Sequence, residues 1–138
     1  MLRNWAAKIS FVIFIAINLP ACADSDEEMF VLATSAQRVA SAIESAVRYK
    51  NAPVSLNEQD LLTFAVKHDP GLLTAFSDYR IHIKRNRKNT VLLICDSEDK
   101  HGLWEDAGCT PRFENHLWQR DPLPPCRPTL DPTKICTR

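Results

Sequence analysis

Four cysteines in the C-terminal half are the residues with the most direct chemistry, and they stand at Cys95, Cys109, Cys126 and Cys136. An even set of cysteines in a short exported chain usually forms structural disulfides. We expect no metal site, because no C-x-x-C pair occurs and the histidines, at 68, 82, 101 and 116, are scattered. The same lack of a C-x-x-C pair argues against a thiol-redox catalyst.

The four cysteines allow three connectivities, and the sequence does not decide among them. We favour sequential pairing, Cys95 with Cys109 and Cys126 with Cys136, because it closes the two shortest loops. Each bridge would stabilise the fold by about 2–4 kcal/mol, mainly by restricting the unfolded chain. Residues 121–132 are too rich in proline for a helix or a central strand, so the second bridge would hold an irregular tail in place.

Five cations gather in one short stretch, at Arg80, Lys84, Arg85, Arg87 and Lys88. Such a patch favours an anionic partner, such as a phospholipid surface, a polyanion or the acidic face of a protein. The alternative is a solvated hairpin whose charges protect the edge of a sheet. The acidic segment 96–99 could also neutralise the patch from a neighbouring turn.

A second candidate site consists of His101, Glu105 and Asp106, an imidazole and two carboxylates that could together run acid–base hydrolysis. Adjacent residues on a strand point to opposite faces, so the two carboxylates are not expected to form a pair. Residues 106–108 are more simply a turn that presents Cys109 to its bridge. No G-x-S-x-G motif supports serine chemistry, and we expect no cofactor.

The N-terminal residues 1–23 have the pattern of a cleaved signal peptide. Arg3 and Lys8 provide the positive charge, and the apolar run 11–17 follows them. This run is well short of the roughly 20 residues that a membrane-spanning helix needs, so we expect no transmembrane span in the mature protein. Residues 24–138 are then expected to form a single domain.

Two cleavage sites compete at the end of the leader, and they give Cys22 different fates. Ala21-Cys22-Ala23 fits the small-x-small rule, which we favour, and predicts a periplasmic or secreted protein. Residues 19–22 also resemble a bacterial lipobox, although proline at its second position is unusual. In that alternative, Cys22 carries a lipid that anchors the protein in the envelope.

Charge and composition describe a globular chain. Lys plus Arg and Asp plus Glu number 17 each, and 45% of the residues are hydrophobic. Because the leader contains two basic residues and no acidic one, the mature chain is slightly acidic. This balance argues against a nucleic-acid partner.

Two helices are expected before the cysteine-rich half. Apolar residues at three- and four-residue spacings predict an amphipathic helix over about 27–50, and they are Leu32, Ala36, Val39, Ile43, Ala46 and Val47. A second helix should begin near Ser55 or Asn57, where Ser55 and Glu58 fit a capping box. Residues 69–71, Asp-Pro-Gly, should stop it.

From residue 79 the hydrophobic period changes to two, which predicts a half-solvated strand. After the polar turn 85–89, the continuous apolar run 90–95 is typical of a central strand, and a third strand is expected around 102–105. We therefore predict an α+β fold. Its two N-terminal helices pack on an antiparallel meander of three to four strands, and a disulfide-stapled irregular tail follows.

The combination of leader, alanine-rich helix, strand 91–95, segment 103–110 and closing cysteines resembles small uncharacterised exported proteins of Gram-negative bacteria, both periplasmic proteins and lipoproteins. The resemblance is one of layout and implies no catalytic residue. It implies a non-enzymatic binding, inhibitor or accessory protein of the cell envelope. Its partner would be another envelope protein or an anionic envelope component. The alternative is a small periplasmic hydrolase that uses His101, Glu105 and Asp106.

Overall fold

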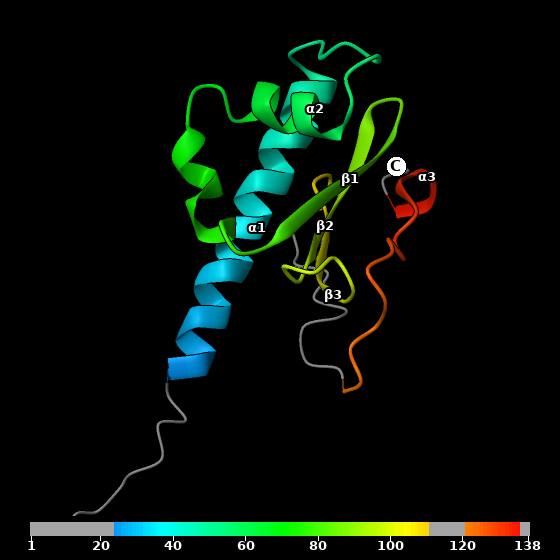
Figure 1. Ribbon diagram of the computed structural model, residues 1–138. Coiled ribbons are helices and arrows are strands. Elements are labelled where there is room, and N and C mark those ends of the chain that lie inside the picture. The colour runs from blue at the N-terminus through cyan, green and yellow to red at the C-terminus, as the bar shows by residue number, and fades with distance from the viewer. Residues whose placement is uncertain (1–23, 111–120, 136–138) are drawn as a thin grey trace, which may run out of the picture.

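The computed structural model describes residues 24–110 and 121–135 (Figure 1). Its elements in chain order are α1 (Asp24–Arg48), α2 (Glu58–Ala65), the 3₁₀ helix η1 (Pro70–Phe76), β1 (Arg80–Asn86), β2 (Asn89–Cys95), β3 (Gly102–Ala107) and α3 (Pro132–Ile135). The strands form one antiparallel sheet in the order β1-β2-β3. The predicted α+β fold, with N-terminal helices packed on a meander, is therefore confirmed.

The long helix α1 supplies most of the core on one face of the sheet. Its predicted apolar stripe is buried, with Val39, Ile43 and Ala46 no more than 1% exposed. Alanines within the stripe let the helix backbone approach the sheet closely, because they place little side-chain volume between the two layers. Trp104 of β3 belongs to the same buried cluster and fills space beneath the helix.

The second helix begins at Glu58 with Asn57 as its N-cap, whose side chain accepts a hydrogen bond of 2.9 Å from the backbone N–H of Asp60. The structure thus uses the later of the two expected starts, and the capping box headed by Ser55 is wrong. Asn57 is as good a cap as serine, and it stands directly before the apolar face of the helix. The side chain of Leu56 packs against the core beside it.

Replacing Asn57 by alanine should lower the free energy of unfolding by about 1 kcal/mol, because the amide of Asp60 then loses its capping acceptor. Urea unfolding monitored by circular dichroism measures the change. Ser55→Ala is the matched control, since Ser55 is exposed and lies outside the helix. An equal loss in the two variants would contradict the assignment of the cap.

Strand β2 is buried on both faces, as its continuous apolar sequence predicts. Leu92 and Ile94 face the helices and belong to the main core. Leu93 and Cys95 face the other way and form a second cluster with Cys126 of the tail. The sheet is thus the middle layer of the fold, with α1 on one side and the C-terminal tail on the other (Figure 1).

The tail 121–135 follows the sheet through backbone contacts rather than as a regular strand. The N–H of Gly102 donates to Pro124 O at 2.9 Å, and the N–H of Cys126 donates to Lys100 O at the same distance. The expectation that the tail contains no helix is wrong, because α3 forms at its end. Pro132 opens that helix, and proline is tolerated there because the first N–H groups of a helix have no intrahelical partner.

The disulfide joins Cys95 to Cys126, with a Cα–Cα distance of 5.7 Å and a sequence separation of 31. Sequential pairing of Cys95 with Cys109 is therefore wrong. Loop length does not decide the pairing. Instead, Cys95 points to the sheet face that the tail covers. Cys109 is also disulfide-bonded. Cys136, the predicted partner of Cys126, lies outside the described residues.

None of the helices within residues 24–110 and 121–135 is long and apolar enough to cross a membrane. The disulfide is consistent with an oxidising compartment. The expected signal peptide 1–23 and its Cys22 lie outside the described residues.

Candidate functional site

The basic stretch forms the hairpin that joins β1 to β2. Asn86 pairs with Asn89 across the ladder, which leaves Arg87 and Lys88 as the two turn residues. Arg87 has a φ of 49°, a left-handed conformation that a tight turn requires. Both turn residues are exposed, so the turn carries two positive charges into solvent.

Arg85, by contrast, has a structural role. Its Nη1 donates to Pro53 O at 2.8 Å and its Nη2 to Ala52 O at 3.0 Å, while its Nε donates to Arg87 O at 3.1 Å. One guanidinium therefore fastens the hairpin turn to the loop after α1. Because these hydrogen bonds engage all three of its nitrogens, the guanidinium of Arg85 braces the turn and is not free to bind a partner.

The other four cations of the stretch, Arg80, Lys84, Arg87 and Lys88, are exposed. Within the described chain, no hydrogen bond or salt bridge engages their charged ends. The pKa of Asp131 is lowered, first by hydrogen bonds from Thr133 and further by the charges of Lys134 and Lys84.

The acidic segment 96–99 does not pair with these cations. Asp96 contacts His101 at 2.8 Å, Glu98 pairs with Lys100, and Asp99 contacts His82 at 2.6 Å. The three carboxylates therefore have partners of their own in or beside the same turn. The expectation that segment 96–99 neutralises the charges of the hairpin is therefore wrong.

Two exposed apolar side chains accompany the hairpin turn. Tyr49 and Val54 flank the loop that Arg85 holds, and they are 75% and 80% exposed. The loop and the turn lie at the same end of the molecule (Figure 1). We call the surface made by Tyr49, Val54, Arg87 and Lys88 the basic tip.

A separate cleft of about 370 Å³ opens where β1, the start of α2 and the tail meet, and it is lined by Glu58, His82, Ile83, Lys84, Arg85, Leu93, Cys126 and Pro128. His82 is its central polar group. Its Nε2 lies 2.6 Å from Asp99 Oδ1, and its Nδ1 lies 3.3 Å from Glu58 Oε2. Burial lowers the pKa of His82, but the hydrogen bonds and charges of Asp99 and Glu58 outweigh it, and the net pKa is raised.

The disulfide lies next to this histidine. The Sγ of Cys126 is 3.2 Å from Asp99 Oδ1, and Cys95 is fully buried behind it. The cleft is lined by the imidazole of His82, the carboxylate of Glu58 and the sulfur of Cys126, and the carboxylate of Asp99 and the buried sulfur of Cys95 lie directly beside them. Sequence reasoning missed this cluster because its members are distant in the chain and share no recognisable spacing. The nearest signal is the alternation along the two predicted strands, which puts His82 and Cys95 on one sheet face only when the register between the strands is known.

The candidate hydrolase residues do not converge. His101 is exposed and contacts Asp96. The buried carboxylate of Glu105 accepts hydrogen bonds from Thr129 and Leu130 of the tail. Asp106 is buried and, as the next residue along β3, points to the opposite face of the sheet. Asp106 and Ala107 also belong to β3, so the turn expected at 106–108 begins later than predicted.

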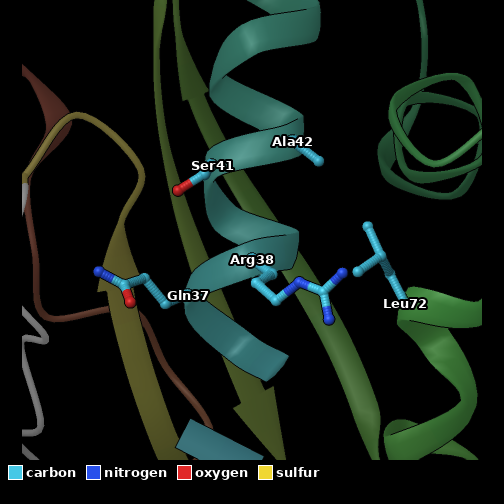
Figure 2. Close-up of a pocket in the computed structure, with 5 residues that line it drawn as sticks. All are labelled: Gln37, Arg38, Ser41, Ala42 and Leu72. Carbon is cyan, nitrogen blue, oxygen red and sulfur yellow. The ribbon is translucent and has the colours of Figure 1, made fainter. Parts of the chain in front are cut away.

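A shallow groove on the outer side of α1 is drawn in Figure 2, lined by Gln37, Arg38, Ser41, Ala42 and Leu72. Arg38 extends from α1 towards Leu72, while Gln37 and Ser41 point to the other side of the helix. The guanidinium of Arg38 lies 3.6 Å from the carboxylate of Asp69, and both side chains are largely exposed. The groove brings no polar groups together and offers no evident chemistry.

Comparison with known proteins does not add to this geometry. The chain matches no family model, no curated protein and no solved structure. The likeness in layout to small exported proteins stays a prediction.

Proposed function

We propose that this protein is a non-enzymatic binding protein of the bacterial envelope, periplasmic or secreted, and that it recognises the acidic face of another envelope protein through its basic hairpin. The observation that carries the proposal is the set of four exposed cations that form no salt bridge in the described chain, Arg80, Lys84, Arg87 and Lys88. Of these, Lys84 interacts electrostatically with the carboxylate of Asp131. The adjacent charges of Arg87 and Lys88 in the turn repel each other, and an anionic partner relieves that repulsion.

The shape and composition of the basic tip favour a macromolecular partner. The turn projects into solvent and is not part of an enclosed pocket, so it suits an extended surface rather than a small molecule. Tyr49 and Val54 add exposed apolar area beside the charges of Arg87 and Lys88. Tyrosine and arginine are enriched among the residues that dominate binding energy at protein interfaces.

The brace made by Arg85 also supports a binding role. Its hydrogen bonds hold the turn and the loop after α1 in one arrangement before any partner arrives. A preorganised surface loses less conformational entropy on binding than a mobile one. In the alternative in which Cys22 is lipidated, the protein itself is tethered to the membrane and binds its partner through the same surface.

Reversing two charges of the basic tip, in the double variant Arg87→Glu and Lys88→Glu, should weaken partner binding at least about tenfold and reduce its salt dependence, because both side chains would repel an acidic face. Proteins cross-linked to the wild type in an envelope extract are identified by mass spectrometry, and the affinity of the recovered partner is then titrated. The matched control is Arg38→Glu with Lys67→Glu, which makes the same change in net charge elsewhere on the surface.

Equal capture by the wild type and by both double variants would overturn the proposal. Vesicles of phosphatidylglycerol and of phosphatidylcholine provide a second arm. Tight, tip-dependent binding to the anionic vesicles, with no protein partner recovered, would assign the surface to an anionic lipid instead.

A further inference from the structure

Four groups that commonly bind metals meet beside the tail, although no cysteine or histidine spacing predicts it. One ligand atom from each of His82, Cys95, Asp99 and Cys126 lies within 4.8 Å of the other three. Two sulfurs, an imidazole nitrogen and a carboxylate oxygen form a donor set that suits tetrahedral Zn²⁺. In the structure the two sulfurs are joined as a disulfide, so the ion would need the reduced form.

The orientation of His82 provides a second, independent observation. Its Nε2 faces Asp99 and the sulfurs, while its Nδ1 faces Glu58, at 3.3 Å. Histidines that bind zinc through one ring nitrogen usually donate the other N–H to a carboxylate, which fixes the ring and raises its basicity. Glu58 is in place for this supporting role, and it comes from a different element, the first turn of α2.

One of the two sulfur ligands is buried in the sheet and the other lies at the open cleft, so an ion could reach the site and be held by a fixed group. Cys95 is fully buried in β2 and provides a fixed sulfur. Cys126 lines the open cleft, and its backbone N–H donates to Lys100 O, so the tail keeps a hydrogen bond to the chain before β3 when the S–S bond is cut. In a tetrahedral zinc site, the ligand atoms lie roughly 3–4 Å apart. The two bonded sulfurs must therefore move apart to that spacing, whereas the four ligand atoms as a group already lie within 4.8 Å of one another.

We infer that the Cys95–Cys126 disulfide and a Zn²⁺ ion are alternative occupants of this site. A dithiol reductant transfers two electrons and two protons to the disulfide and becomes a disulfide itself, leaving Cys95 and Cys126 as thiols. Zn²⁺ then displaces both thiol protons, and any proton on the coordinating nitrogen of His82, and Asp99 completes the ligand set. The ion fastens the tail to the sheet as the disulfide does. This inference does not depend on the proposed partner.

The test uses the full chain, reduced with a dithiol and freed of it by gel filtration without oxygen. Zn²⁺ is titrated against a chromophoric chelator. We expect one ion bound per reduced chain through this site and none per oxidised chain. Co²⁺ in place of Zn²⁺ should give the absorption of a tetrahedral site with a thiolate charge-transfer band.

Variants locate the site. Glu58→Gln should weaken Zn²⁺ binding about 10–100-fold through loss of the supporting carboxylate. His82→Asn should weaken it further, because it removes a ligand. His101→Asn is the matched control, since its ring contacts Asp96 and is not part of the cluster. Cys126→Ser should weaken Co²⁺ binding and lower the intensity of the thiolate band, because Cys95 is then the one thiolate left in the ligand set, whereas Cys109→Ser should keep both the affinity and the full band.

The inference is overturned if the reduced wild type binds no Zn²⁺, or if binding is lost in Cys109→Ser and kept in His82→Asn. It is also overturned if reduction unfolds the chain and Zn²⁺ fails to restore its near-ultraviolet circular dichroism. Unchanged affinity in both Glu58→Gln and His82→Asn would show that the thiols bind the metal without the folded site.

Discussion

Replacing Glu105 by alanine should lower the free energy of unfolding by about 2–4 kcal/mol and release residues 129 and 130 of the tail from the sheet. The carboxylate is fully buried. Its Oε1 accepts from the backbone N–H of Thr129 at 2.6 Å and of Leu130 at 2.7 Å, and its Oε2 accepts from the Thr129 hydroxyl at 2.6 Å. Alanine would leave all three donors without this acceptor. Chemical denaturation measures the loss of stability.

Hydrogen exchange gives a local measurement of the same effect. The amides of Thr129 and Leu130 should exchange much faster in Glu105→Ala, while those of β2 keep their order of protection. Glu98→Ala is the matched control, because that carboxylate is exposed and pairs only with Lys100 in a turn. Unchanged protection at the two tail amides would show that Glu105 does not anchor the tail.

Besides the two backbone hydrogen bonds at Pro124 and Cys126, a disulfide and side-chain hydrogen bonds hold successive parts of the tail on the sheet. The Cys95–Cys126 disulfide holds its first part, Glu105 holds residues 129 and 130, and Asn89 holds the end by donating to Pro132 O at 3.2 Å. A segment so rich in proline has few N–H groups to pair as a strand. Side-chain and covalent ties therefore replace the missing ladder. Leu93 is buried because the tail held in this way covers its side of the sheet.

Local patterns in the sequence were enough to predict the helices and the meander. The stripe of α1 repeats at helical spacing over many turns, and the apolar run of β2 has the length of a buried strand. The bounds shifted by a few residues, because the ends of elements depend on capping and tertiary contacts. The 3₁₀ helix η1 was not predicted, since it is short and is stabilised by packing of Phe76 rather than by periodicity.

The site and the disulfide could not be predicted, because both depend on which sheet face the tail covers. His82 pairs with Leu93 in the register, which puts its side chain on the same face as Cys95. That relation is visible only once the strands are aligned. The position of Cys126 against them depends on the path of an irregular segment, for which sequence carries no periodic signal. The length of the loop between two cysteines, on which sequential pairing was predicted, does not indicate which face of the sheet the tail covers.

Gly108 shows how closely β3 approaches the long helix. A Cβ built on this residue would lie 2.4 Å from Ala40 O, 2.7 Å from Glu44 Cβ and 2.9 Å from Ala40 C. Two of these atoms belong to the backbone of α1 and cannot rotate away. Its φ is not positive, so an alanine is conformationally allowed there. Glycine is thus required at position 108 because α1 leaves no room for a side chain, and this contact sets the distance between the helix and the end of β3.

Gly108→Ala should therefore lower the free energy of unfolding by about 1–3 kcal/mol, because α1 must shift away from the sheet to admit one methyl group. Thermal and urea unfolding measure the loss. Gly71→Ala is the matched control, since its Cβ would meet only the side chain of Asp69, at 3.3 Å, and should change stability by no more than about 0.5 kcal/mol. Equal stability of Gly108→Ala and the wild type would mean that the helix can move from the sheet without cost.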